Sequence, residues 1–300
     1  MRRFLVLTAL CAALVAPTVP LASASSSHSE TLTVAGQRVK VYTNVPLAGS
    51  TTVDRAVVVI HGTGRTAQAY RDRMVSAAKK AGVGGRTAVL APYFDDSWSN
   101  DAWKAGGNSS RGVSSYAVAD ALLALLADKA KFPNVTRVVL AGHSAGGQFT
   151  QRYAAVGQRT VDAYAVMNPS SYVYLDQWRP ASTKNCAQSY DRWKYGLAKR
   201  SGYVAALTNQ QVIARYTSRS VTVFNGGDDV AADSDLDVSC PANAQGKRRL
   251  DRGKAYSDYI RAHFPAAHHS YLVVPRVGHD SGAMFADPKT WPTLFGVAVA

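Results

Sequence analysis

Short segments of consecutive apolar residues alternate along the chain with longer segments in which apolar residues recur every three or four positions. The short segments are typical of strands that are buried on both faces of a parallel sheet, and the longer ones indicate amphipathic helices. Strands are predicted at residues 56–60, 87–91, 137–141, 163–167, 221–225 and 271–274, of which 56–60 and 87–91 are expected to be buried on both faces. Helices are predicted at residues 67–81, 115–131, 147–155, 247–263 and 291–297.

Ahead of the first buried strand, residues 31–34 and 37–43 predict a two-stranded hairpin that turns at Gly36. The alternation of strands and helices predicts a three-layer α/β fold with a mostly parallel central sheet. Residues 170–218 interrupt this alternation, since the segment is rich in Tyr, Trp and Arg and is long for a connection. We therefore expect one domain over residues 25–300, with a cap insertion at about residues 170–218.

The N-terminus has the pattern of a secretory signal peptide. Two arginines precede an apolar core at residues 4–15, and Ala22-Ser23-Ala24 supplies the small-residue cleavage pattern. We therefore predict that residues 1–24 are removed and that the mature protein is secreted. The apolar core is too short to cross a membrane, which takes about 20 residues, so no membrane anchor is expected.

Composition narrows the set of partners. The chain has 34 Lys and Arg against 20 Asp and Glu, but the basic residues are scattered and no nucleic-acid-binding motif accompanies them. Cys11 lies in the predicted signal peptide, which leaves Cys186 and Cys240. An even pair of cysteines in an oxidising compartment predicts one disulfide. We expect a monomer that binds no nucleic acid.

The strongest chemical signal is the segment Gly142-His143-Ser144-Ala145-Gly146, which lies between the predicted strand at 137–141 and the predicted helix at 147–155. A serine with glycines two positions away on either side, at a turn from strand to helix, is the pattern of a nucleophile elbow. The turn is so tight that side chains at the two glycine positions would collide with neighbouring backbone. It raises the serine hydroxyl clear of the chain, so we predict that Ser144 is a nucleophile.

A general base for Ser144 should lie on a loop at the carboxyl end of a strand, because those loops line one edge of a parallel sheet. His279 follows the last predicted strand, on a loop in which Gly278 permits a sharp turn. The remaining histidines lie in the N-terminal tail, at the opposite sheet edge, inside the elbow, or at a strand end where they orient backbone: His28, His61, His143, His263, His268 and His269. We therefore assign the base to His279.

The third member of such a site should be a carboxylate that follows a strand and lies between Ser144 and His279 in the sequence. The predicted strand at 221–225 leads into Gly226-Gly227-Asp228-Asp229. We favour Asp229, because its spacing from the first glycine lets the loop turn before the side chain is presented. Asp228 is the alternative acid.

Backbone N–H groups should meet the negative charge that develops on the substrate oxygen. One donor should be Ala145, the residue after the nucleophile. The other should come from the loop after the strand at 56–60, where Gly62 frees the backbone to turn the amide of Thr63 inward. A phosphate-binding loop is the alternative, but the Lys-Ser/Thr ending of such loops is missing here.

Together these motifs resemble the α/β-hydrolase superfamily over about residues 30–300. The resemblance implies an α/β-hydrolase fold and a secreted bacterial serine hydrolase that cleaves carboxylic esters through an acyl-enzyme. Such chemistry requires no metal or organic cofactor. Thr63 interrupts the extended glycine run of the lipase subgroups, so a lipase is not expected. The alternatives are an acyltransferase or a peptidase with the same triad, or a non-catalytic binding protein on the same scaffold.

Substrate preference, for a small-molecule or polymeric ester, should come from the loop at 93–111 and from the cap insertion. Their aromatic side chains predict a groove for an acyl chain or a polymer. The residues are Trp98, Trp103 and Tyr172, with Tyr174 and Trp178 beside them. The alternative is that these side chains pack the cap onto the sheet.

A run of carboxylates, Asp233, Asp235 and Asp237, invites comparison with calcium-binding loops. An EF-hand is excluded, because Val238 stands at the sixth position of the loop and Ala244 at the twelfth. We expect solvated loop charges and no metal site, with a looser calcium site as the alternative.

Overall fold

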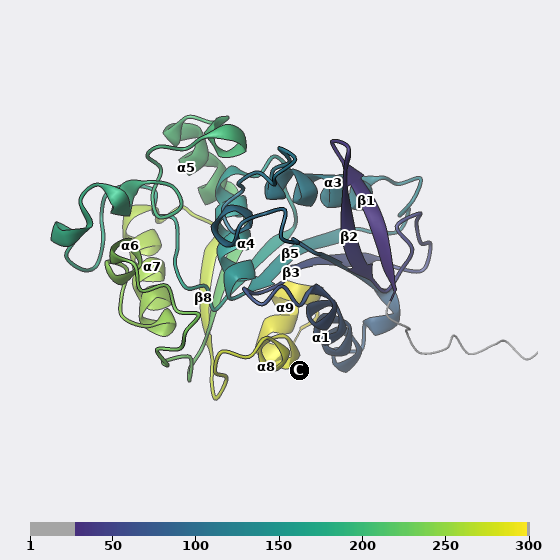
Figure 1. Ribbon diagram of the computed structural model, residues 1–300. Helices are drawn as coiled ribbons and strands as arrows, with labels where there is room; N and C mark the ends of the chain where they lie inside the picture. Colours follow the sequence, from purple (N-terminus) through teal and green to yellow (C-terminus); the bar gives the residue numbers. More distant parts are fainter. Residues whose placement is uncertain (1–27, 299–300) are drawn as a thin grey trace, which may run out of the picture.

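The computed structural model describes residues 28–298, so the predicted signal peptide and Cys11 lie outside the described residues. Eight strands form one sheet in the order β1-β2-β4-β3-β5-β6-β7-β8 (Figure 1). Pairing is antiparallel from β1 through β2 to β4 and parallel in the rest of the sheet. The strands are β1 (Ser29–Val34), β2 (Gln37–Thr43), β3 (Arg55–Ile60), β4 (Thr87–Pro92), β5 (Arg137–His143), β6 (Ala163–Met167), β7 (Val221–Gly226) and β8 (His269–Val274).

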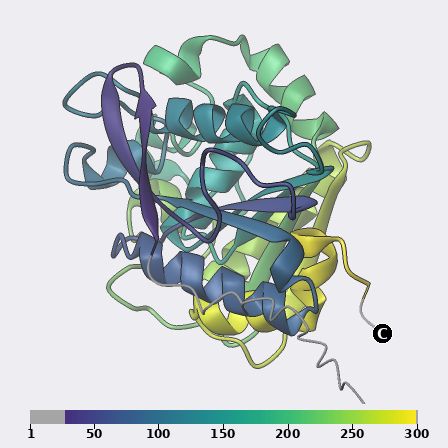
Figure 2. The ribbon, with the colours of Figure 1, turned by 90° about the vertical axis from the view of Figure 1, so that its right-hand side faces the viewer.

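Helices cover both faces of the sheet, which confirms the predicted three-layer α/β fold (Figure 2). The helices are α1 (Ala67–Lys80), α2 (Asn100–Trp103), α3 (Ser115–Ala127), α4 (Ala145–Val156), α5 (Asn209–Ser218), α6 (Cys240–Asn243), α7 (Arg249–His263), α8 (Ser281–Ala286) and α9 (Trp291–Phe295). Buried residues of α1, α8 and α9 form the core on one face, and those of α3, α4, α5 and α7 form the core on the other.

The wholly apolar strands follow from this double coverage. Successive side chains of a strand point to opposite faces, so a strand between two layers of helices needs apolar residues at every position. In β3, Val57 and Val59 belong to the core with α1, whereas Val58 and Ile60 belong to the core with α3 and α4. The pattern that predicted β3 therefore also places it inside the sheet, whereas β8 lies at an edge with two exposed apolar residues.

Differences from the predicted elements are local. The helix predicted at 115–131 ends at Ala127, where Asp128 has an extended backbone. Helices α2, α5, α6 and α8 were not predicted. Of these, α5 begins with a capping box in which Thr208 and Gln211 satisfy each other's backbone amides. That local hydrogen bonding stabilises a helix inside a segment whose apolar pattern does not indicate one.

Residues 170–218 run over the helical layer that contains α4, as short 3₁₀ turns followed by α5. A disulfide joins Cys186 of this segment to Cys240 at the start of α6, which confirms the predicted pairing. It connects the predicted cap insertion to the chain that follows the loop after β7. Among residues 28–298, none of the helices has the length and apolar character that crossing a membrane requires.

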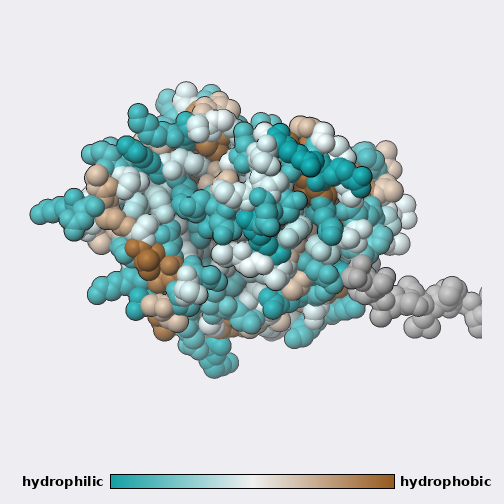
Figure 3. Space-filling view, viewed as in Figure 1, coloured by the Kyte–Doolittle hydropathy of each residue, from teal (hydrophilic) through white to brown (hydrophobic). Residues whose placement is uncertain are grey.

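On the face of the molecule seen in Figure 3, hydrophilic side chains predominate and the hydrophobic ones form small, separate patches. The large apolar side chains that are exposed are Trp178, Val230, Val238, Leu272 and Val273. Leu272 and Val273 lie on β8, the edge strand of the sheet.

Candidate active site

Ser144 stands at the turn between β5 and α4 with a backbone φ of 59° and ψ of −122°. A positive φ is rare for a residue with a Cβ and marks local strain. The flanking glycines are required by the packing: a Cβ on Gly142 would overlap the carbonyl oxygen of Gly146, and one on Gly146 would overlap that of Ile60. The amide of Ser144 donates to the carbonyl of Met167 at 2.9 Å, which ties the turn to β6.

His279 follows β8 and lines a cavity of about 240 Å³ together with Ser144 and Thr63. Its Nδ1 lies 2.8 Å from Oδ2 of Asp229, which follows β7 and is fully buried. A carboxylate only accepts hydrogen bonds, so the Nδ1 atom carries the proton. The Nε2 atom of the same ring is buried and has no hydrogen-bond partner among residues 28–298. The ring therefore keeps an acceptor free at this cavity.

The two candidate acids have different environments. Asp228 is exposed, and its amide donates to the carbonyl of Val277 at 3.0 Å. Asp229 is buried, and its carboxylate is hydrogen-bonded to the imidazole of His279. The amide of Asp229 donates to the carbonyl of Gly226 at 3.2 Å, and the structure buries the side chain of Asp229 while it leaves that of Asp228 exposed.

Arg249, the first residue of α7, was not predicted to take part in the site. Its fully buried guanidinium makes a two-pronged ion pair with Asp233, at 2.6 and 2.7 Å, and lies 3.4 Å from Oδ1 of Asp229. The hydrogen bond from Arg249 is the main reason that the pKa of Asp233 lies below its ordinary value. Arg249 thus fastens the loop after β7 to α7 and supplies positive charge beside Asp229.

In the carboxylate run for which a looser calcium site was the alternative, two of the three side chains already have partners within the protein. Asp233 is paired with Arg249, and Asp237 accepts hydrogen bonds from Tyr195 and the amide of Ser239. Among the residues that the structure describes, no group of three or more His, Cys, Asp and Glu side chains is arranged to hold a metal ion.

Asn168, the residue after β6, connects three parts of the site and was also missed. Its Oδ1 accepts from the amide of Gly226 at 2.8 Å, and its Nδ2 donates to the carbonyl of Gly278 at 3.2 Å. The same Nδ2 donates to Nε2 of His143 at 3.2 Å. Asn168 has a φ of 45°, a conformation that asparagine tolerates better than most residues. The only sequence signal for Asn168 was its position directly after a predicted strand.

His143 lies inside the elbow and is buried there as a packing residue. Because Nε2 accepts from Asn168, the ring carries its proton on Nδ1, which lies 3.4 Å from the hydroxyl of Tyr70. Burial is the main cause that holds the pKa of His143 well below its ordinary value. The neutral ring packs against His279, with the two ring centroids 4.7 Å apart.

The loop after β3 carries the predicted oxyanion donor Thr63, and His61 organises its backbone. The Nδ1–H group of His61 donates to the carbonyl of Gly62 at 2.9 Å, and Nε2 accepts from the amide of Phe94 at 3.2 Å. The contact at Nε2 requires a neutral ring, because the protonated ring has no acceptor, and burial lowers the pKa of His61 to about 4. Thr63 lines the cavity with Ser144, while Ala145 is fully buried at the start of α4.

The aromatic residues predicted to form a substrate groove lie elsewhere. Trp98, Trp103 and Tyr172 are almost completely buried, and none of them lines the cavity at Ser144. Trp103 stacks on Phe94 with ring centroids 5.6 Å apart, and Tyr172 stacks on Tyr256 at 4.4 Å. The packing alternative fits these side chains, because joining a long loop and an insertion to the sheet takes large apolar surfaces.

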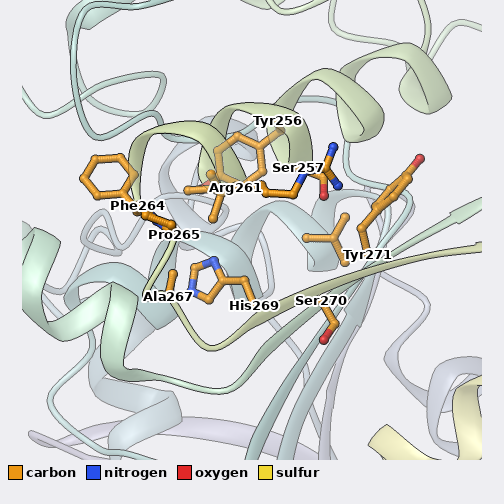
Figure 4. Close-up of a pocket in the computed structure, with 11 residues that line it drawn as sticks. Tyr256, Ser257, Arg261, Phe264, Pro265, Ala267, His269, Ser270 and Tyr271 are labelled. Atoms are coloured by element: carbon orange, nitrogen blue, oxygen red, sulfur yellow. The ribbon is translucent and has the colours of Figure 1, made fainter.

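A separate cavity of about 220 Å³ lies between α7 and β8 (Figure 4). Tyr256, Phe264 and Tyr271 give it aromatic walls, and His269 stands at its base with Nε2 2.9 Å from the carbonyl of Tyr216. Neither Ser144 nor His279 lines it.

No protein-family model matches the sequence, and no curated protein matches it. Solved structures do match. A poly(3-hydroxybutyrate) depolymerase from Bordetella parapertussis is 25% identical, with a TM-score of 0.71 over 92% of each chain. A poly(aspartic acid) hydrolase from Sphingomonas sp. KT-1 is 22% identical, with a TM-score of 0.65 over 86% of this chain and 94% of that one. A fluorophosphonate-binding serine hydrolase from Staphylococcus aureus is 13% identical, with a TM-score of 0.52 over 91% and 98% of the two chains.

The buried neutral His61 predicts a specific dependence of stability on pH. Its folded-state pKa of about 4 lies below the ordinary 6.5, so the unfolded chain binds more protons between these values. The His61 contribution to stability is therefore complete above pH 6.5 and is lost as the pH falls toward 4. Between pH 7 and pH 4.5 it should lower the free energy of unfolding by roughly 2 kcal/mol.

Urea unfolding across this pH range would measure the effect in the wild type and in His61→Asn. The variant should be less stable at pH 7 but should lose less stability on acidification. His268→Asn, which changes an exposed histidine, is the matched control and should keep the wild-type slope. Equal slopes in His61→Asn and the wild type would show that His61 is not held neutral.

Proposed function

Because the chain belongs to the α/β-hydrolase superfamily, we propose that it is a serine hydrolase that cleaves carboxylic esters through Ser144, His279 and Asp229. The single observation that carries the proposal is the state of the His279 ring. One nitrogen is hydrogen-bonded to a buried carboxylate, and the other is unpaired among the described residues, in the cavity that Ser144 lines. That is the arrangement a general base needs.

In the proposed mechanism, Oγ of Ser144 attacks the ester carbonyl while Nε2 of His279 takes its proton. Asp229 holds the ring in the tautomer that leaves Nε2 free and stabilises the imidazolium that forms. The amides of Thr63 and Ala145 stabilise the negative charge on the carbonyl oxygen. The protonated His279 then gives its proton to the departing alcohol, and a water molecule, activated by the same ring, releases the acyl group from Ser144.

We also propose a substrate class, a domain organisation and a cellular location for the protein. One structural neighbour is named a depolymerase of a polyester and another a hydrolase of a polyamide, which supports a small-molecule or polymeric substrate with an acyl bond. We propose a single catalytic domain over residues 25–300 with a cap at about 170–218, secreted after removal of residues 1–24. The Cys186–Cys240 disulfide supports an oxidising compartment.

The direct test of the nucleophile is Ser144→Ala. This variant should lose hydrolysis of p-nitrophenyl acetate by at least 10³-fold, because no acyl-enzyme forms without the hydroxyl. Its circular dichroism and thermal unfolding should match the wild type, since removal of one hydroxyl leaves the turn intact. Retention of wild-type turnover by Ser144→Ala would rule out the proposed mechanism.

The choice between the two aspartates gives a matched pair of variants. Asp229→Asn should lower kcat by roughly 10³–10⁴-fold, because an amide no longer holds the productive tautomer of His279. Asp228→Asn changes the same charge one residue away on an exposed side chain and should stay within about twofold of the wild type. The reverse ranking of the two variants would assign the acid to Asp228.

A further inference from the structure

We propose that a second cavity beside Ser144 binds a neutral, hydroxyl-rich part of the substrate, such as a sugar or a polyol. This inference rests on the proposed ester hydrolysis and names the group that the ester carries. The cavity has a volume of about 330 Å³ and is lined by polar side chains, chiefly Gln148, Lys104, Lys194, Tyr195 and Asp237.

The position of this cavity links it to the reaction. Thr63 and Asp235 line both this cavity and the one that contains Ser144 and His279. A substrate whose carbonyl lies over Ser144 therefore reaches the second cavity across Thr63, the proposed oxyanion donor. Gln148 lies one helical turn after Ser144 in α4, so the helix that sets the nucleophile also sets a wall of the second cavity.

Gln148 gives the clearest indication that this cavity binds a ligand. It is only 5% exposed, and its Oε1 accepts from the hydroxyl of Ser171 at 3.4 Å. Its Nε2 donates to no residue in the described part of the chain, yet the side chain lines the cavity. The Nε2 atom is reached by solvent, so an acceptor group of a ligand in the cavity can take its hydrogen bond in place of water.

The charges of the cavity are balanced. Lys194 donates to Asp101 at 2.7 Å, and Lys104 lies 3.4 Å from the same carboxylate. On the other wall, Tyr195 donates to Asp237 at 2.8 Å. Beneath them, the buried guanidinium of Arg152 donates to the carbonyls of Lys104 and Lys194.

This balance selects among ligand classes. Three carboxylates, those of Asp101, Asp235 and Asp237, stand against the two ammonium groups and the guanidinium of Arg152, so an anionic ligand gains no net attraction. Leu236 is the one aliphatic side chain among the lining residues, so a long acyl chain would lose water without gaining apolar contacts. A hydroxyl group donates to a carboxylate and accepts from an amide or ammonium, which matches the donors and acceptors present. The cavity of Figure 4 shares no lining residue with this one.

The test compares kcat/KM within two matched pairs of esters. In the first pair, 6-O-acetylglucose against hexyl acetate, the hydroxyls lie on the alcohol. In the second, methyl gluconate against methyl hexanoate, they lie on the acyl group. We expect kcat/KM to be higher for the hydroxylated ester by about tenfold or more in at least one pair. That pair identifies whether the alcohol or the acyl group of the ester occupies the cavity.

Two substitutions test whether such a preference arises from contacts in this cavity. Gln148→Leu and Lys194→Met should each reduce the ratio of kcat/KM within the preferred pair by about tenfold, the effect of one lost hydrogen bond. Gln210→Leu and Lys254→Met make the same changes on exposed side chains outside the cavity and should keep the wild-type ratio. Using ratios within a pair removes general effects on folding or on the amount of active protein.

The outcomes separate this inference from the proposed function. If the apolar ester is equally good or better in both pairs, or if neither cavity variant changes the ratio, the inference is overturned while ester hydrolysis stands. If the Ser144→Ala protein hydrolyses these esters as fast as the wild type, the proposed function itself fails.

Discussion

The candidate site depends on one steric constraint: helix α4 begins so close to the strands on both sides of β5 that its second and third residues, Gly146 and Gly147, have no room for side chains. Gly146 packs against the backbone of β3 at Ile60, and Gly147 packs against the backbone of β6 at Met167. Because β3 and β6 are the two neighbours of β5, the turn is held from both sides. This packing maintains the positive φ of Ser144, since the surrounding structure leaves the turn no relaxed alternative.

The loops that face Ser144 are held by buried polar groups. Asn168 hydrogen-bonds with Gly226 at the end of β7 and with Gly278 on the loop that carries His279. Arg249 joins the loop after β7 to α7 through its ion pair with Asp233. Buried amides and guanidinium groups are costly unless they are paired, so each of them specifies one arrangement of the loops. The geometry between His279 and Asp229 therefore depends on side chains that do not take part in the proposed chemistry.

The sequence predicts the frame of this structure well, because the frame obeys short-range rules. Strands buried on both faces are wholly apolar, the elbow requires glycines at fixed positions, and the carboxyl ends of parallel strands share one edge. These rules bring Ser144, His279 and Asp229 into consideration from the sequence alone. The cysteine pair was predicted separately, from an even number of cysteines in an oxidising compartment.

The sequence did not predict Asn168 or Arg249, whose roles depend on contacts between segments far apart in the chain. It also placed Trp98, Trp103 and Tyr172 in a substrate groove, whereas they are buried in the core. Aromatic residues in a long loop suit both packing and binding, and only the three-dimensional position of the loop distinguishes the two. The second polar cavity is likewise assembled from five separate parts of the chain, so no local sequence pattern predicts it.

The central claim is that this strained serine is activated by the histidine and carboxylate beside it. Reaction of the folded protein with a fluorophosphonate, followed by intact-mass and peptide-mass analysis, tests it directly, because the reagent forms a stable adduct with an activated serine. We expect one adduct per chain, located on the peptide that contains Ser144, and a greatly slowed reaction in His279→Ala. Absence of an adduct on the folded wild-type protein, or an adduct on a different serine, would contradict it.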